Sequence, residues 1–470
     1  EAGEGRNPTH QLKELGGEAL KAFRDRYRIP ISDEIIAQAP FYKPPENSRE
    51  MAYLRERQQA MGGPVPSRRT QAQPLTVPEL AVFDALLKGT GEREMSTTMA
   101  FVRALTALAR DKTIGKHIVP IIPDEARTFG MEGLFRQLGI YASQGQLYEP
   151  VDSAEVMYYR EDAGGQILEE GINEAGSISS FIAAGTSYAN YGVHMVPFYA
   201  FYSMFGFQRV GDFIWAAADS RTRGFLIGAT SGRTTLAGEG LQHLDGHSHV
   251  LAATVPSCRA YDPTYAYELA VIIQDGMRRM YRDQEEVFYY ITVTNENYRM
   301  PAMPEGAEAG IVQGMYLLSP ADKPGKRHVQ LLGSGAILRE VLGAAELLKE
   351  LEITSDVWSV TSFTELARGA EDVRRRQRLQ PEAAHAPSYV ERALASRPEG
   401  PVIAATDYMK LYAEQIRGAV ARPYVVLGTD GFGRSDTRED LRHFFEVDRK
   451  HVAYAAVHAL AQSGALDKRS

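Results

Sequence analysis

Two adjacent carboxylates, Asp124 and Glu125, follow an apolar run at residues 118–122, separated from it by Pro123 alone. Like charges at this separation split their pKa values, so one carboxyl can stay protonated near neutral pH and serve as an acid beside a basic partner. The alternative is that the two carboxylates end a strand in an ion pair with Arg127. The pattern alone leaves both interpretations open.

Three histidines, His243, His247 and His249, lie around Asp245 in one short segment. Neutral imidazole is the commonest metal ligand, which raises the question of a metal site. Two histidines four residues apart need a helix to face one ion, whereas Asp245 followed by Gly246 is typical of a turn, and no zinc-type signature accompanies them. We therefore expect no metal here; acid–base work, contact with a substrate anion and a structural role in the loop stay open.

Glu174 lies at the start of a helical pattern at residues 173–190 that is rich in small side chains. A carboxylate in the first turn of a helix is stabilised by the helix dipole. From composition alone, Glu174 is therefore a helix-start carboxylate.

These candidate residues follow or lie between short apolar runs that we expect to be parallel β-strands. The runs lie at 118–122, 195–199, 224–228 and 287–293, with helical patterns between them. Such alternation predicts a parallel sheet covered by helices. Because open sheets of this kind bind ligands at the carboxyl ends of their strands, the loops after these runs are where a site is expected.

A second series of apolar runs, at 329–332, 355–360, 401–405 and 424–427, predicts another α/β domain. A Gly-rich start followed by an amphipathic helix and a connector rich in Pro and Gly precede the first domain. The expected parts are a loop and helix at 1–30, an extended connector at 31–90, an α/β domain at 91–300, a linker at 301–324 and a second α/β domain at 325–470.

Composition excludes several classes of function. A net charge of −8 argues against a general nucleic-acid surface, which needs clustered Lys and Arg. No apolar run reaches the roughly 20 residues of a membrane span. The single cysteine, Cys258, cannot form an internal disulfide and fits a reducing compartment, so we expect a cytoplasmic protein.

Four loop segments resemble those of the homodimeric bacterial pyruvate dehydrogenases, the acetyl-transferring first component of the pyruvate dehydrogenase complex. They are DEARTFGMEGLF at 124–135, EGINE at 170–174, YSMFGFQR at 202–209 and GEGLQH at 238–243. The similarity runs over essentially the whole chain. It implies two parallel-sheet α/β domains of transketolase type, a pyrimidine-binding domain at 91–300 and a transketolase-like carboxyl-terminal domain at 325–470.

The resemblance implies oxidative decarboxylation of pyruvate with thiamine diphosphate and reductive acetylation of the lipoyl group of dihydrolipoamide acetyltransferase, by a homodimer. Glu174 then matches the glutamate that bonds the pyrimidine ring nitrogen of the cofactor and promotes its activated tautomer. Phe205 matches the aromatic side chain that stacks on the pyrimidine, with Tyr202 beside it.

Five further residues receive roles from the same resemblance. Asp124, Glu125, Glu239 and His243 match polar groups around the substrate and the cofactor adduct. His10 matches a histidine on a mobile active-site loop that is associated with reductive acetylation.

The sequence departs from the family pattern at the diphosphate. Thiamine enzymes hold the diphosphate and its magnesium with Gly-Asp-Gly and a later Asn-Asn, because a divalent cation needs hard oxygen ligands. Neither motif occurs in the 470 residues, and the sequence starts at Glu1 without Met. We therefore expect an amino-terminal domain outside this sequence to hold most of the cofactor and the magnesium, and the chain to be a fragment or one piece of a cleaved enzyme.

Two other functions stay open. One is a transketolase-type transfer of two-carbon units between sugar phosphates, which would need basic phosphate contacts at the mouth of the site. The other is a catalytically silent module for dimerisation or complex binding, which the missing diphosphate motifs motivate.

Overall fold

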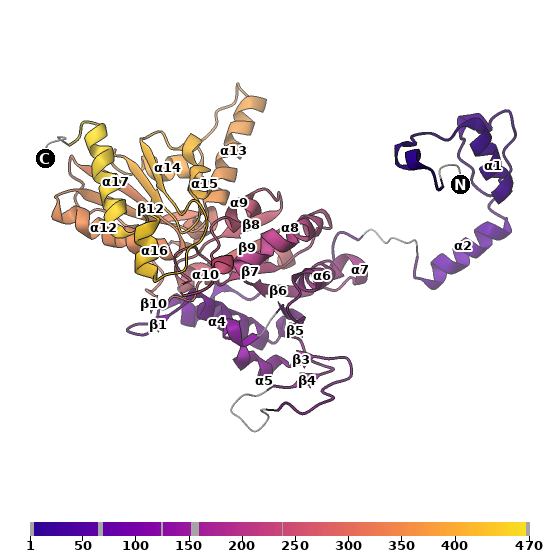
Figure 1. The fold of residues 1–470 in the computed structure, drawn as a ribbon, viewed down its shortest axis with the longest axis horizontal. Coiled ribbons are helices and arrows are strands. Elements are labelled where there is room, and N and C mark those ends of the chain that lie inside the picture. Colours follow the sequence, from indigo (N-terminus) through magenta and orange to yellow (C-terminus); the bar gives the residue numbers. More distant parts are fainter. Residues whose placement is uncertain (1–3, 64–68, 124–125, 152–158, 237, 467–470) are drawn as a thin grey trace. The chain divides into compact units, whose positions relative to one another are not determined.

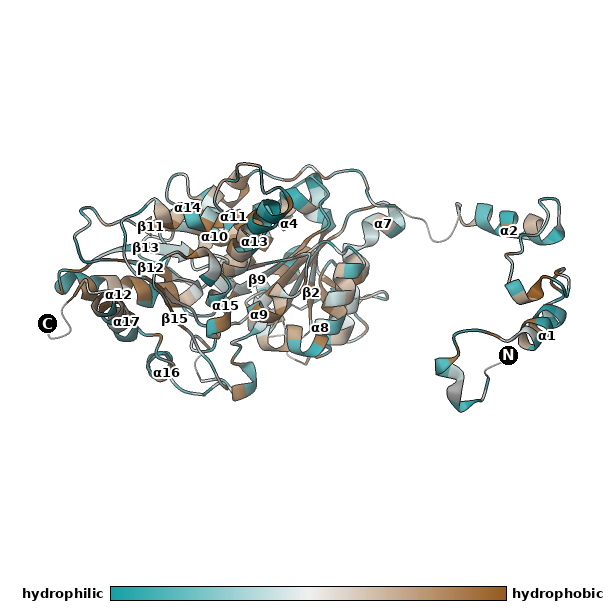
Figure 2. Cartoon of the chain, turned by 90° about the horizontal axis from the view of Figure 1, so that it is seen from above, coloured by the Kyte–Doolittle hydropathy of each residue, from teal (hydrophilic) through white to brown (hydrophobic). Residues whose placement is uncertain are grey.

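The computed structural model describes residues 4–63, 69–123, 126–151, 159–236 and 238–466. The chain divides into two compact units, Glu1–Arg68 and Arg69–Ser470. In the first unit, the helices are η1 (Asn7–Gln11), α1 (Gly17–Tyr27), η2 (Ile36–Gln38) and α2 (Arg49–Ala60). Neither α1 nor α2 has a buried residue, and Figure 2 shows α2 as mostly hydrophilic.

The second unit contains a six-stranded parallel sheet with strand order β5-β2-β6-β7-β9-β8. Its strands are β2 (Ile118–Ile122), β5 (Leu168–Glu169), β6 (Val196–Phe201), β7 (Phe225–Ala229), β8 (Cys258–Tyr261) and β9 (Phe288–Val293). Every residue of β6, β7 and β9 is buried, which explains why these strands are nearly continuous apolar runs. The helices that accompany this sheet are α4 (Thr97–Arg110), α6 (Glu174–Gly185), α8 (Ser203–Asp219), α9 (Ser248–Ala253) and α10 (Ala266–Met277).

A second sheet has strand order β11-β13-β12-β14-β15. Its strands are β11 (Met315–Ser319), β12 (His328–Gly333), β13 (Thr354–Val360), β14 (Val402–Ala405) and β15 (Tyr424–Leu427). The accompanying helices are α12 (Leu338–Glu350), α13 (Phe363–Leu379), α14 (Tyr389–Ala395), α15 (Lys410–Glu414), α16 (Arg438–Phe444) and α17 (Arg449–Gln462), in orange and yellow in Figure 1.

The two α/β parts confirm the expected fold class, with one correction to the second sheet. Strand β11 pairs antiparallel with β13, so this sheet is mixed and not purely parallel. β11 also lies within the segment that we expected to be a linker. An antiparallel edge strand on an otherwise parallel sheet is common, because it needs no crossover helix.

Shorter elements connect these layers. They are η3 (Leu80–Phe83), α3 (Asp84–Leu87), β1 (Glu94–Met95), η4 (Gly115–His117), η5 (Ala126–Phe129), η6 (Glu132–Leu134), α5 (Phe135–Leu138), β3 (Ile140–Tyr141), β4 (Glu161–Asp162), α7 (Ser187–Tyr191), η7 (Leu241–His243), η8 (Arg278–Arg282), β10 (Tyr298–Arg299), α11 (Glu308–Gln313), η9 (Gly335–Ile337) and η10 (Arg417–Ala419). Within the described residues, none of the helices combines the length and the apolar character that crossing a bilayer requires.

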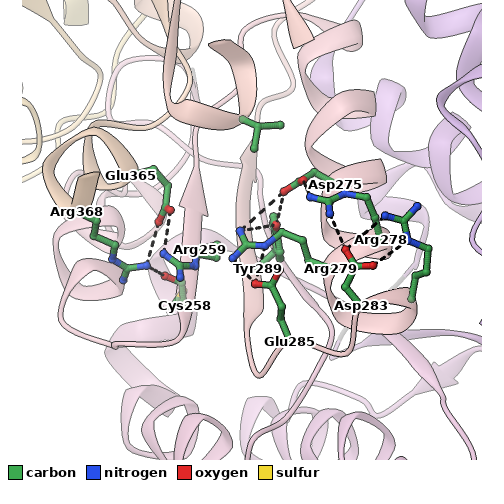
Figure 3. Close-up of polar contacts among 12 residues, drawn as sticks. Cys258, Arg259, Asp275, Arg278, Arg279, Asp283, Glu285, Tyr289, Glu365 and Arg368 are labelled. Carbon is green, nitrogen blue, oxygen red and sulfur yellow. Dashed lines mark hydrogen bonds and ion pairs between the residues drawn. The ribbon is translucent and has the colours of Figure 1, made fainter. Parts of the chain in front are cut away.

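One ion pair and a hydrogen bond to the backbone connect α13 of the second α/β part to β8 of the first sheet (Figure 3). Glu365 of α13 accepts hydrogen bonds from Arg259 of β8 and from Arg368, each at 3.0 Å. Arg368 also donates to the backbone oxygen of Cys258 at 2.6 Å. Because the Cys258 thiol is fully enclosed, burial raises its pKa to about 12. This thiol is therefore a packing group and not a nucleophile.

Candidate active site

The candidate side chains lie at the carboxyl end of the first sheet. Glu174 follows β5, Tyr202 and Phe205 follow β6, and Glu239 and His243 lie in the segment after β7. Since β5, β6 and β7 all run in the same direction, the loops at their carboxyl ends emerge at one edge of the sheet.

Glu174 is the first residue of α6 and is held there by the helix cap. The side chain of Asn173 accepts a hydrogen bond from the backbone N–H of Gly176 at 3.1 Å, which fixes the start of the helix. Only 13% of the Glu174 side chain is exposed, and its Oε1 accepts a hydrogen bond from Nη1 of Arg209 at 2.8 Å. The carboxylate is thus largely enclosed and paired with a cation.

Arg209 connects Glu174 to the aromatic side chains of the candidate site, which are Tyr202, Phe205 and His243. It lies one helical turn after Phe205 on α8, and its guanidinium carbon is 3.9 Å from the centre of the Phe205 ring. A Cβ at Gly206 would overlap the ring of Phe201, so glycine allows this end of α8 to lie close to β6. Arg209 has no predicted role from the sequence, although the spacing of four residues between Phe205 and Arg209 on one helix indicates that the two side chains can contact each other.

Three aromatic rings surround the same spot. The ring centres of Phe205 and His243 are 5.2 Å apart, those of Tyr202 and His243 are 5.1 Å apart, and those of Tyr202 and Phe205 are 6.0 Å apart. The buried Nδ1 of His243 has no hydrogen-bond partner within the described part of the chain, and Oε2 of Glu239 lies 3.6 Å away. An orphaned buried nitrogen is uncommon and is typical of a group that meets a ligand or a water molecule.

Two of the histidines singled out in the sequence have other surroundings. The ring of His249 is fully buried, and its Nε2 is 2.8 Å from the hydroxyl of Thr292. Burial lowers the pKa of His249 to about 3, so this imidazole is neutral at physiological pH. Nε2 of His247 contacts the side chain of Gln208 on α8. Within the described residues, His243 alone of the three contacts the rings of Tyr202 and Phe205.

Three predicted site residues are not placed in this cluster. Asp124 and Glu125 lie outside the residues that the structure describes. His10 lies on η1 in the first unit and is exposed, so its role stays a prediction.

A cavity of about 550 Å³ opens at the loop that leads to Glu174. Glu169, Gly171 and Ile172 contribute to its lining, together with Ala126 and Tyr159.

The cluster of Glu174, Tyr202, Phe205 and His243 combines an aromatic ring face, a partly enclosed carboxylate and an imidazole whose buried Nδ1 has no hydrogen-bond partner among the described residues. Such a set suits a planar heteroaromatic ring with a hydrogen-bonding edge.

Two family models match the second unit. Residues 75–301 match the pyruvate dehydrogenase E1 component middle domain, and residues 314–448 match the transketolase-like C-terminal domain.

Curated relatives match along the whole chain. The pyruvate dehydrogenase E1 component of Pseudomonas aeruginosa is 61% identical over 470 residues, which is 100% of this chain and 53% of the relative. That of Escherichia coli strain K12 is 54% identical over 473 residues, again 100% of this chain and 53% of the relative. That of Mycolicibacterium smegmatis is 50% identical over 471 residues, 99% of this chain and 51% of the relative. The chain thus spans about half the length of these relatives.

Solved structures share the fold at low sequence identity. A transketolase from Campylobacter jejuni superposes with a TM-score of 0.63 at 16% identity, covering 97% of this chain and 61% of that chain. A transketolase from Leishmania mexicana superposes with a TM-score of 0.59 at 16% identity, covering 82% of this chain and 48% of that chain. The transketolase-type architecture expected from the sequence is confirmed.

Proposed function

We propose that this chain is a member of the family of the pyruvate dehydrogenase E1 components, about half of whose length it spans, and that it supplies the pyrimidine-binding half of a thiamine-diphosphate site. The reaction is oxidative decarboxylation of pyruvate, followed by reductive acetylation of the lipoyl group on dihydrolipoamide acetyltransferase. The observation that carries the proposal is the convergence of Glu174, Phe205, Tyr202 and His243 at the carboxyl end of one parallel sheet.

The described residues fit the pyrimidine ring of this cofactor. The Phe205 ring offers an aromatic face, and the Glu174 carboxylate lies beside it through the shared contact with Arg209. When bound, thiamine diphosphate supplies the electron sink that lets a 2-oxo acid lose carbon dioxide. Glu174 holds a proton at the ring nitrogen, and its enclosure by protein keeps water from competing for that proton.

The remaining polar groups act around the substrate. His243 exchanges a proton at its Nδ1, the nitrogen that has no hydrogen-bond partner among the described residues. Glu239 lies near this imidazole, with 3.6 Å between its Oε2 and the Nδ1, and its negative charge would stabilise the protonated ring. The resemblance also assigns Asp124 and Glu125 to the surroundings of the substrate and His10 to reductive acetylation, and the proposal includes these roles although Asp124 and Glu125 lie outside the described residues.

The diphosphate and its magnesium need ligands from elsewhere. The sequence has neither Gly-Asp-Gly nor Asn-Asn, so oxygen ligands for the metal come mainly from a domain outside these residues. We infer a homodimer in which the two halves of each site come from different subunits. The lipoyl domain of dihydrolipoamide acetyltransferase is the partner that accepts the acetyl group.

Substrate turnover distinguishes the candidate functions. The full-length protein that contains this chain, supplied with thiamine diphosphate and magnesium, should reduce a dye acceptor when pyruvate is added. A ketose phosphate with an aldose phosphate acceptor should give no transfer. Transfer between the sugar phosphates without any reaction of pyruvate would establish the transketolase-type alternative, and no turnover with either pair would favour the silent module.

A further inference from the structure

Two imidazoles and a carboxylate meet where the last long helix begins. His443 lies in the final turn of α16, Asp448 is the N-cap residue of α17, and His451 lies in the first turn of α17. Figure 1 shows both helices at the yellow end of the ribbon. None of the three residues has a part in the proposed site, and His451 lies just beyond the stretch matched by the C-terminal family model.

The spacing within this cluster suits a metal ion. Oδ2 of Asp448 is 3.1 Å from Nδ1 of His443, and Oδ1 of Asp448 is 2.9 Å from Nδ1 of His451. One potential ligand atom from each of the three residues lies within 4.8 Å of the others. In a tetrahedral zinc site, bonds of about 2.0–2.1 Å place neighbouring ligand atoms roughly 3.4 Å apart, so small rotations of the side chains would suffice.

The Nδ1 atoms of His443 and His451 can serve either as hydrogen-bond donors or as metal ligands. A neutral imidazole that donates through Nδ1 to Asp448 can move its proton to Nε2, which leaves a lone pair on Nδ1 for a metal. No other side-chain hydrogen bond of His443 or His451 is present in the described part of the chain. The two histidines are therefore free to bind an ion without breaking other contacts.

Two neighbouring arginines form ion pairs with other carboxylates. Arg449, next to Asp448, donates to Glu340 through Nε at 2.9 Å. Arg442, next to His443, donates to Glu296 through Nη2 at 2.5 Å. Because these guanidinium groups already have anionic partners, the Asp448 carboxylate is available to balance part of the charge of a divalent ion.

We propose that His443, Asp448 and His451 bind a divalent transition-metal ion of the zinc type, with the fourth position taken by water. Two nitrogen ligands and one carboxylate favour such an ion over magnesium or calcium, which prefer all-oxygen shells. The bound ion would tie the end of α16 to the start of α17. The proposed metal site does not depend on the proposed reaction, because its three residues lie outside the candidate active site. Its test therefore measures zinc binding and not turnover.

Calorimetric titration of the full-length protein with Zn²⁺, in the presence of saturating Mg²⁺, tests this proposal. We expect one equivalent of zinc to bind to the wild type, and His443→Ala and His451→Ala each to weaken that affinity at least tenfold. His458→Ala is the matched control, since His458 is on α17 outside the cluster and stacks on Tyr454. It should bind zinc as the wild type does.

The unfolding temperature gives a second measurement on the same proteins. Zinc should raise the unfolding temperature of the wild type and of His458→Ala, and should leave both cluster variants unchanged. Circular dichroism shows whether each variant is folded before titration. Equal zinc affinity in the wild type and the two cluster variants, or no zinc binding by the folded wild type, would overturn the proposal.

Discussion

Arg209 contacts two side chains that come from different strand ends. Its guanidinium donates to Glu174 at 2.8 Å and covers the ring of Phe205 at 3.9 Å. About half of the Arg209 side chain is exposed, at 49%. A pair with this exposure adds at most about 1 kcal/mol to stability, so we infer that Arg209 positions the two side chains more than it stabilises the fold.

Removal of Arg209 should therefore affect turnover more than folding. We expect Arg209→Ala to reduce pyruvate turnover on the order of tenfold or more, because Glu174 and Phe205 lose their common contact, while the unfolding temperature changes little. Arg209→Lys should recover part of the activity, since it keeps the charge but not the planar stacking. Steady-state kinetics with pyruvate and thermal unfolding are the two measurements.

A second ion pair on the same domain provides the control. Arg221 and Glu286 lie 3.1 Å apart, and both side chains are about half exposed. Arg221→Ala removes a similar pair outside the cluster and should leave turnover unchanged. Equal losses of activity in Arg209→Ala and Arg221→Ala would mean that Arg209 has no special part in the site.

At the scale of elements, a buried carboxylate joins strands β8 and β9. Asp262 follows β8 directly, and its Oδ1 accepts a hydrogen bond from Thr292 of β9 at 2.7 Å, whereas its Oδ2 has no partner among the described residues. Burial raises the pKa of Asp262 to about 7; the Thr292 hydrogen bond opposes this rise, and the charges of Asp407 and Glu268 add to it. This end of the sheet thus prefers a protonated carboxyl.

The raised pKa makes the free energy of unfolding depend on pH. Between the unfolded value of 3.8 and about 7, the folded chain binds the proton more tightly, so this contribution to stability falls as pH rises. Asp262→Asn cannot ionise and should lose less stability between about pH 5 and about pH 8 than the wild type does. A shift of one pKa unit corresponds to about 1.4 kcal/mol. Urea unfolding should therefore show that the wild type loses at least about 1 kcal/mol more stability than Asp262→Asn over this pH range. If the free energy of unfolding depended on pH identically in the two proteins, Asp262 would not be the group with the raised pKa.

The sequence predicted the central strands of the first sheet better than its edges. The apolar runs at 118–122, 195–199, 224–228 and 287–293 correspond to β2, β6, β7 and β9, which are buried between neighbours. The edge strands β5 and β8 were missed. β5 has two residues, and β8 contains Arg259, so neither has a long apolar pattern. β11, the antiparallel edge of the second sheet, was missed although residues 315–318 are apolar, because the segment around it is charged and was expected to be a linker.

The candidate site was predictable where strand direction decides it. Parallel strands bring the loops that hold Glu174, Phe205 and His243 to one edge, and the resemblance supplied their roles. The contact of Arg209 with Glu174 joins residues 35 positions apart on different helices, which no local pattern reveals. The lack of a hydrogen-bond partner for Nδ1 of His243 among the described residues is likewise a property of the packed structure.

At the scale of the whole molecule, the chain contains two α/β parts of transketolase type and spans about half the length of its relatives. The ion pair between Arg259 and Glu365, and the hydrogen bond from Arg368 to the backbone of Cys258, connect the second part to β8 of the first sheet. In the proposed function, the first sheet supplies the residues that contact the pyrimidine ring, and the ligands of the diphosphate come mainly from outside this sequence. The central claim is therefore that Glu174 activates a cofactor held jointly with another domain.

The most direct test of this claim is the turnover of pyruvate by Glu174→Gln in the full-length protein, with Glu286→Gln as the matched control. Glu174→Gln keeps the size of the side chain and removes the carboxylate that, in the proposed function, exchanges a proton with the cofactor. We expect kcat to fall on the order of a hundredfold or more, the range of acid–base catalysis, while Glu286→Gln keeps wild-type turnover. Near-normal turnover by a correctly folded Glu174→Gln would contradict the account.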